Sequence, residues 1–495
     1  MATMIAIANH GSSAIPALYL TLILALYNIL ISNNTTVSAN AIFSLKYRYA
    51  GTNRSLNSLK AHDTNRLKML SNVALPIGGT GRPDSFGLYY TKVGIGDPSN
   101  SYYMQVDTGS DVMWVNCIEC TECPERGYHG MELTLYNPKD SLTAKLLSCD
   151  GQFCLEVNGG PLMGCKPNLS CTYAELYGDG SSSTGYFVKD IIQYDQVSGD
   201  LETSAANGSV FFGCSAGEFV DQGSSDDTLD GVLAFGKANS SIISQLAASG
   251  QVRKMFAHCL DGVNGGGIFA IGHIVQPKVN TTPLVQSQPH YTVNMTAVKV
   301  GSEFLRLPSD FFKIGGQKGA IIDIGTTLCY FPEVLYEPLV IKILSQRPDL
   351  KFIVQDQYTC FQYSESVDDG FPPITFYFEN SLSLTVYPHE YLFIFEDMWC
   401  VGWQNSGMQS RDKMNLTLLG DLVLSNKLVL YDLENQVIGW TEYNCSSSIQ
   451  VKDEQTGTVH LVGPQNLSSA SSVNIIQAVM ILLSLYNIYF LVCLY

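Results

Sequence analysis

The sequence predicts an all-β protein of two lobes of similar size with few short helices. From about Asp84, short alternating segments such as GLYYTKVGIGDPSNSYYMQVDTGS are separated by Gly, Pro, Asn and Asp, a pattern typical of strands and turns. An acid-bearing stretch occurs twice, as MQVDTGSDVMW and AIIDIGTTL, which indicates an internal repeat. At 495 residues the chain is also too long for one ordinary core.

Each acid-bearing stretch is followed downstream by a second recurring element. DGVLAFG (230–236) follows the first stretch, and LTLLGDLVLSNK (416–427) follows the second. Both are apolar strands that end near Gly and can lie beside the acid-bearing loop. We therefore expect an N-terminal lobe over 76–288 and a C-terminal lobe over 289–445. Segments such as SIISQLAASG and EVLYEPLVIKIL have helical spacing, and we expect them to cover the sheets.

Composition favours a well-packed globular protein, because 46% of residues are apolar and only 15% are charged. The net charge is -17 and no long run of Lys or Arg occurs. A surface that neutralises phosphates is therefore not expected, and nucleic acid is excluded as a partner. The acidity fits simple solubility and work in acidic surroundings equally well.

The first 38 residues predict a secretory signal. PALYLTLILALYNILI (16–31) is apolar and uncharged, and small and polar residues follow it. No Lys or Arg precedes the apolar run, so an uncleaved anchor is the alternative. Fourteen cysteines indicate an oxidising compartment. Several Asn-x-Ser/Thr sequons predict glycosylation, at Asn168, Asn207, Asn239, Asn280, Asn294 and Asn415.

Residues 39–75 reverse the charge of the acidic chain and predict a pro-segment. One acid, Asp63, faces six basic residues: Lys46, Arg48, Arg54, Lys60, Arg66 and Lys68. A basic segment can lie along an acidic body at neutral pH and dissociate when carboxylates protonate. The alternative is a solvated N-terminal arm.

The C-terminal end predicts a glycolipid anchor. Residues 446–472 are expected to form a polar stalk, with small residues SSASS (468–472) in the attachment region. Residues 473–495 form a hydrophobic propeptide that ends at the last residue, with no basic cluster behind it. An ordinary spanning helix is the alternative.

These motifs resemble the plant pepsin-like aspartic endopeptidases of the glycolipid-anchored, nepenthesin-like type. The resemblance rests on DTGS followed by WV, on ELYGDGSSSTGYF, and on a second Asp-x-Gly-Thr. It implies a bilobal pepsin-like fold in which Asp107 and Asp323 are catalytic. It also implies a monomeric zymogen with an acidic pH optimum, polypeptide substrates, no cofactor, and a place on the outer plasma membrane or outside the cell.

The chemistry of peptide hydrolysis explains why two carboxyls are needed. One must take a proton from water while the other protonates the carbonyl oxygen. Two carboxyls held close together cannot both ionise cheaply, so they share one proton and work at acidic pH. A single Asp-x-Gly is usually a turn, but two in matching apolar settings favour the pair Asp107 and Asp323.

Residues beside each aspartate are expected to support it. Gly109 and Gly325 let the backbone approach the carboxylates closely. The hydroxyls of Ser110 and Thr326 match those that bond the aspartates in the family. Either is otherwise an ordinary turn hydroxyl.

Tyr177 lies near the tip of a predicted hairpin that resembles the family's flap. Such a hairpin would close over a peptide and exclude water, with Tyr177 bonded to Trp114. The alternative is a surface hairpin with a packed tyrosine.

Ile324 departs from the family pattern, which has Thr or Ser between Asp and Gly. Thr108 keeps its hydroxyl in the first loop, but Ile324 cannot donate. We expect facing groups to be left unpaired, at a cost on the order of 1–3 kcal/mol if dry. A weakly active or inactive surface binding protein is therefore the alternative function.

The cysteines predict six disulfides. Cys493 lies in the tail and Cys329 is expected to be a buried free thiol; twelve others remain to pair, namely Cys117, Cys120, Cys123, Cys149, Cys154, Cys165, Cys171, Cys214, Cys259, Cys360, Cys400 and Cys445. Zinc is disfavoured because secreted thiols oxidise and no His cluster is present, so no metal is expected. A serine or cysteine protease is disfavoured, because none of the eight His residues stands in a nucleophile-elbow context such as Gly-x-Ser-x-Gly.

Overall fold

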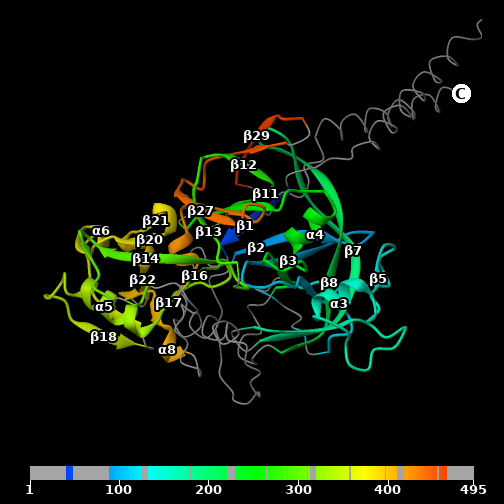
Figure 1. Cartoon of the computed structure of the whole chain (residues 1–495), viewed down its shortest axis with the longest axis horizontal. Helices are drawn as coiled ribbons and strands as arrows, with labels where there is room; N and C mark the ends of the chain where they lie inside the picture. Colours follow the sequence, from blue (N-terminus) through cyan, green and yellow to red (C-terminus); the bar gives the residue numbers. More distant parts are fainter. Residues whose placement is uncertain are drawn as a thin grey trace, which may run out of the picture. The chain divides into compact units, whose positions relative to one another are not determined.

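A computed structural model describes residues 41–47 and 89–464, apart from 122, 124–126, 128–131, 178–180, 220–228, 263–265, 287, 309, 313–318, 356–357, 396, 410–416 and 454–455 (Figure 1). The backbone alone is described for 41–47. The predicted signal, most of the predicted pro-segment and the hydrophobic tail lie outside the described residues. Residues 39–495 form one compact unit, so the lobe boundaries stay a prediction.

The largest sheet runs through both halves of the sequence. In spatial order its strands are β13 (Asn280–Pro283), β27 (Val437–Glu442), β26 (Lys427–Asp432), β10 (Met255–Leu260), β11 (Gly267–Ile271), β1 (Ala41–Tyr47), β2 (Tyr89–Ile95), β3 (Asn100–Asp107), β9 (Gly231–Ala234), β4 (Trp114–Asn116), β8 (Glu202–Phe219), β7 (Ser182–Gly199) and β5 (Lys145–Leu146), and β6 (Thr172–Leu176) pairs with β7. Strands β7 and β8 form the long hairpin seen in Figure 1.

Three smaller sheets are also formed by the described residues. The second sheet contains β21 (Ser383–Val386), β20 (Ile374–Phe378), β14 (Thr292–Val300), β16 (Gly319–Ile322), β25 (Thr417–Leu419), β17 (Cys329–Phe331) and β24 (Trp403–Asn405), with β15 (Glu303–Phe304) on β14. The third contains β18 (Phe352–Gln355), β19 (Tyr358–Phe361), β23 (Met398–Val401) and β22 (Leu392–Phe395). The fourth contains β12 (His273–Gln276), β28 (Ile449–Lys452) and β29 (Val459–Val462).

The helices are short, as the sequence predicts. They are α3 (Gln152–Val157), α4 (Ile242–Ala248), α5 (Glu333–Leu344), α6 (Val367–Gly370), α7 (Pro388–Tyr391), α8 (Ser406–Gln409) and α9 (Asp421–Leu424), with a 3-10 turn at Glu379–Ser381. The two segments predicted to be helical correspond to α4 and α5, each of which buries apolar residues on one side. The all-β prediction is confirmed.

The internal repeat places both acid-bearing strands in the same local arrangement. Strand β3 ends at Asp107 and pairs in parallel with β9, and β16 ends just before Asp323 and pairs in parallel with β25. Both downstream elements therefore lie beside the acid-bearing strands, as expected. Gly231 is required for this packing, because a Cβ there would lie 2.0 Å from the Trp114 carbonyl oxygen.

Strand β1 lies inside the predicted pro-segment and is part of the largest sheet. Its residues 41–45 pair with 267–271 of β11, and residues 46 and 47 pair with β2. This strand therefore separates β11 from β2. Whether the segment is later removed stays a prediction.

The beginning of the predicted polar stalk folds differently from the expectation. Strands β28 and β29 form a hairpin on β12, and Ile449, Val451 and Val462 are buried there. Cys445, immediately before the hairpin, is bonded to Cys259 of β10. The segment is polar on average, but its alternating apolar residues suffice to pair with β12 and pack on the largest sheet. Residues 449–452 and 459–462 of the predicted polar stalk therefore form paired strands.

Candidate active site

Asp107 and Asp323 line the same cleft. Asp107 is 0% exposed and Asp323 is 3% exposed. The cleft has a volume of about 290 Å³, and its lining includes both aspartates. Two strand ends that are far apart in sequence therefore present carboxyl groups to one shared cavity.

The Asp107 carboxylate is held by its own loop. The Gly109 N–H donates to Asp107 Oδ1 at 2.8 Å, and the Ser110 hydroxyl donates to Oδ2 at 2.6 Å. Hydrogen bonds that stabilise a buried carboxylate offset part of its loss of hydration. The residues after Asp107 thus fix the orientation of its carboxyl group.

The Asp323 carboxylate is held from both loops. Its own loop supplies the Thr326 hydroxyl, which donates to Oδ2 at 2.7 Å. The other loop supplies the Thr108 hydroxyl, 3.2 Å from Oδ1. Gly325 has a φ of +144°, a conformation that favours glycine, so the residue type is needed for the shape of the second loop.

The two loops are also joined through their backbones. The Ile324 N–H donates to the Thr108 hydroxyl oxygen at 2.9 Å. In the other direction, the Thr108 N–H donates to the Ile324 carbonyl at 3.1 Å. We expected the groups facing Ile324 to be left unpaired because Ile324 has no hydroxyl. The Thr108 N–H is nevertheless paired, with the Ile324 carbonyl.

Tyr177 follows β6 and contacts Trp114 at the cleft. The Trp114 indole N–H donates to the Tyr177 hydroxyl, and the Tyr177 N–H bonds the Ser181 carbonyl across the hairpin. Burial first, and then the charges of Glu175 and Asp107, raise the pKa of Tyr177 well above its usual value. Its phenol therefore stays neutral and can both donate and accept.

Comparisons with known proteins agree with this geometry. A family model described as "Xylanase inhibitor N-terminal" matches residues 89–273, and "Xylanase inhibitor C-terminal" matches 290–442. Aspartic proteinase 39 of Arabidopsis thaliana is 45% identical over 90% of this chain and 93% of its own length. Aspartic proteinase 36 of the same plant is 47% identical over 88% of this chain and 90% of its own.

The chain belongs to the plant pepsin-like aspartic proteinases. A more distant member, aspartic proteinase nepenthesin-2 of Nepenthes gracilis, is 28% identical over 73% of this chain and 79% of its own. The solved structure of conglutin gamma from lupine seeds shares the fold, with a TM-score of 0.60 at 16% identity over 82% of this chain and 96% of that one. The bilobal pepsin-like fold expected from the sequence is thus confirmed.

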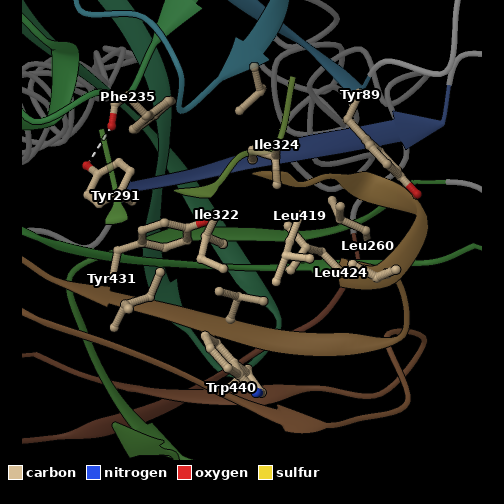
Figure 2. Close-up of a cluster of buried hydrophobic side chains, with 14 of the residues drawn as sticks. Tyr89, Phe235, Leu260, Tyr291, Ile322, Ile324, Leu419, Leu424, Tyr431 and Trp440 are labelled. Atoms are coloured by element: carbon tan, nitrogen blue, oxygen red, sulfur yellow. Dashed lines mark hydrogen bonds between the residues drawn. The ribbon is translucent and has the colours of Figure 1, made fainter. Parts of the chain in front are cut away.

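Ile324 is an apolar member of the core in this pepsin-like chain. It is 0% exposed, and Figure 2 shows it among buried side chains that include Ile322, Leu419 and Tyr431. Its side chain stabilises the second loop by burial of apolar area. The usual hydroxyl at this position is replaced by packing, while the backbone bonds between the loops persist.

Three titratable residues of the cleft were missed by sequence reasoning. Asp111, Glu175 and His290 line it with the aspartate pair. Burial, then the charges of Asp111 and Asp107, raise the pKa of Glu175 to about 7. Burial also raises the pKa of Asp111, although the Ala238 N–H donates to this carboxylate at 2.8 Å. The alternation of Tyr173 and Glu175 on β6, continued by Tyr177 just after the strand, was the signal for a cleft-facing acid.

The twelve cysteines form six disulfides and Cys329 is a buried free thiol, as predicted. The pairs are Cys117–Cys214, Cys120–Cys123, Cys149–Cys165, Cys154–Cys171, Cys259–Cys445 and Cys360–Cys400. The cysteines weighed as zinc ligands are therefore oxidised. In the described part of the chain, no helix has the length and apolar character needed to cross a bilayer.

Proposed function

We propose that the protein is an aspartic endopeptidase that cleaves polypeptides with water activated between Asp107 and Asp323. The observation that carries this proposal is the placement of both buried carboxylates at one cleft, with a hydroxyl donor on each. Membership of the aspartic proteinase family supports it.

The proposed reaction needs one proton shared by the pair. The ionised carboxyl takes a proton from a water molecule, and the resulting hydroxide attacks the peptide carbonyl carbon. The protonated carboxyl donates its proton to the carbonyl oxygen, which gives a neutral tetrahedral intermediate. This intermediate collapses when the leaving nitrogen is protonated, and the pair returns to its starting state.

The hairpin that carries Tyr177 would cover the bound peptide. Its bond to Trp114 fixes the tyrosine over the cleft, and closure would remove bulk water from the reacting carbonyl. Val112, Val157 and Leu418 supply apolar surface for side chains beside the cut. A polypeptide therefore suits the mixed lining of this cleft.

Cleavage of an unfolded polypeptide between about pH 3 and pH 6 tests the proposal. Purified, processed protein should cut it, and a statine-type inhibitor should stop the cleavage. Asp107→Asn and Asp323→Asn should each abolish the inhibitor-sensitive part. Cleavage that survives both substitutions would assign the activity to other residues or to a contaminant.

The second candidate is a surface protein that binds without cutting. It is favoured by Ile324 and by the description of the matching family models as halves of a xylanase inhibitor. If the wild type does not cleave but Ile324→Ser does, the site has lost activity through this residue. If neither cleaves although both are folded, a binding role is supported.

We further propose a secreted, glycosylated precursor held on the cell surface. This proposal rests on the predicted signal (1–38), the predicted pro-segment (39–75) and the predicted glycolipid tail (473–495). The disulfides agree with an oxidising compartment. A phosphatidylinositol-cleaving phospholipase should release the protein from intact cells. Retention after this treatment would favour the spanning helix instead.

A further inference from the structure

The loop between β9 and α4 is fixed to the first acid-bearing loop. The Gly236 N–H donates to the Ser110 carbonyl at 2.8 Å, and the Ala238 N–H donates to Asp111 Oδ1 at 2.8 Å. At the other end, just before α4, the Ser241 hydroxyl donates to the Ala238 carbonyl at 2.8 Å. These hydrogen bonds set the position of the loop beside the cleft.

Asn239 is an exposed residue of this loop. The residues on either side of it, Ala238 and Ser240, both line the cleft, whereas Asn239 is not part of the lining. A group attached to the Asn239 side chain would therefore stand at the edge of the cleft without filling it. Asn239 thus marks the rim of the cavity that holds the aspartate pair.

Asn239, Ser240 and Ser241 form one of the predicted glycosylation sequons. Ser241 is fully buried, so a sugar must be attached before this loop folds. The other predicted sequons in the described part of the chain do not adjoin a cleft-lining residue, and they begin at Asn168, Asn207, Asn280 and Asn294. Of these positions, Asn239 alone would place an oligosaccharide beside the cleft.

We propose that Asn239 carries an N-linked glycan at the rim of the cleft, and that this glycan selects flexible polypeptides as substrates. The inference rests on the proposed peptidase function and adds a substrate class to it. A bulky, hydrated oligosaccharide keeps the surface of a large folded protein away from the aspartate pair by steric exclusion. A single extended strand needs only the opening of the cleft, which stays free because Asn239 lies outside the lining.

Occupancy of Asn239 is the first measurement. The full chain is expressed in a eukaryotic secretory host, and its peptides are treated with a peptide N-glycosidase in isotopically heavy water. This treatment converts each glycosylated asparagine into a labelled aspartate, which mass spectrometry locates. We expect the label at Asn239. An unmodified Asn239 would overturn the inference whether or not the protein cleaves peptides.

Asn239→Gln tests the effect of the glycan on substrates. We expect kcat/KM for a folded protein with one cleavable surface loop to rise about threefold or more, because more orientations of approach become productive. The kcat/KM for a short peptide should stay unchanged. Asn207→Gln is the matched control, because it removes a glycan from an exposed position on β8, and it should change neither value. An Asn239→Gln variant with the wild-type ratio of the two values would contradict the proposal.

A labelling experiment tests the glycan if the wild type shows no inhibitor-sensitive cleavage, in which case the proposed function fails by itself. Glu175→Cys places a thiol in the cleft lining on β6, and the native free thiol of Cys329 is buried. The glycan should slow the reaction of this thiol with a maleimide on a protein-sized polymer more than with a small maleimide. Adding Asn239→Gln should remove that difference. Equal relative rates with and without the glycan would overturn the inference.

Discussion

The indole N–H of Trp114 donates to the hydroxyl of Tyr177, which joins β4 to the hairpin at the cleft. Trp114→Phe removes this donor while keeping an aromatic ring. We expect kcat/KM to fall about three- to tenfold, because the hairpin would lose a bond of about 1 kcal/mol that orders it over the substrate. Steady-state kinetics on one peptide measures the change. Tyr173→Phe is the control, because it removes a hydrogen bond to Ser183 in the same hairpin. If it lowers kcat/KM equally, general loosening of the hairpin explains the effect of Trp114→Phe.

Thr108→Val should destabilise the protein. The buried Ile324 N–H would lose its acceptor and Asp323 would lose a donor, at a cost of about 1–3 kcal/mol. Urea unfolding measures the difference in free energy. Thr91→Val is the matched control, because Thr91 is equally buried and its hydroxyl has no partner within the described residues. An equal loss of unfolding free energy in Thr108→Val and Thr91→Val would contradict a stabilising role for the Thr108 hydrogen bonds.

Glu175 makes stability depend on pH in a defined window. Its pKa of about 7 in the folded protein lies above the value of an unfolded glutamate, about 4.3. The folded state therefore holds a proton that the unfolded state releases, and stability falls as pH rises between these values. Asp230, whose pKa burial raises to about 6, acts in the same direction, so a variant is needed to isolate Glu175.

Glu175→Gln should flatten the dependence of the unfolding midpoint on pH between about 4.3 and 7. Glu156→Gln, at an exposed position on α3, should leave the slope unchanged. A wild-type slope retained in Glu175→Gln would mean that the carboxyl titrates normally.

The C-terminal hairpin should contribute to stability, unlike a stalk. A chain that ends after Ser446 loses Ile449, Val451 and Val462 but keeps the Cys259–Cys445 disulfide. Each buried aliphatic side chain contributes about 1.5–3 kcal/mol, so we expect an unfolding midpoint several degrees lower than that of a chain ending after Pro464. Thermal unfolding of the two forms measures this difference. Equal midpoints would contradict a stabilising contribution from the packing of Ile449, Val451 and Val462.

The sequence predicted those parts of the site that are local in the chain. Ser110 and Thr326 lie three residues after their aspartates, and a loop of that length returns the hydroxyl to the carboxylate. The disulfide number and the free Cys329 followed from counting. Motif spacing therefore suffices where a single loop builds the contact.

Contacts between distant strands were not predictable in this way. The sequence shows that Ile324 lacks a hydroxyl, which predicted unpaired groups around it. It does not show that the Ile324 carbonyl accepts the Thr108 N–H. The strands β28 and β29 in the predicted stalk were not foreseen, because the average polarity of the segment hid their alternating apolar residues.

The bond between Cys259 and Cys445 sets how far a mechanical load can travel along the chain. A pull on the end of the protein would first peel β29 and β28 away from β12. Unravelling would then stop at Cys445, because a covalent link passes the force directly into β10. If the tail tethers the protein to a surface, tension on the tether would stretch this terminal hairpin before it disturbed the sheet that carries Asp107.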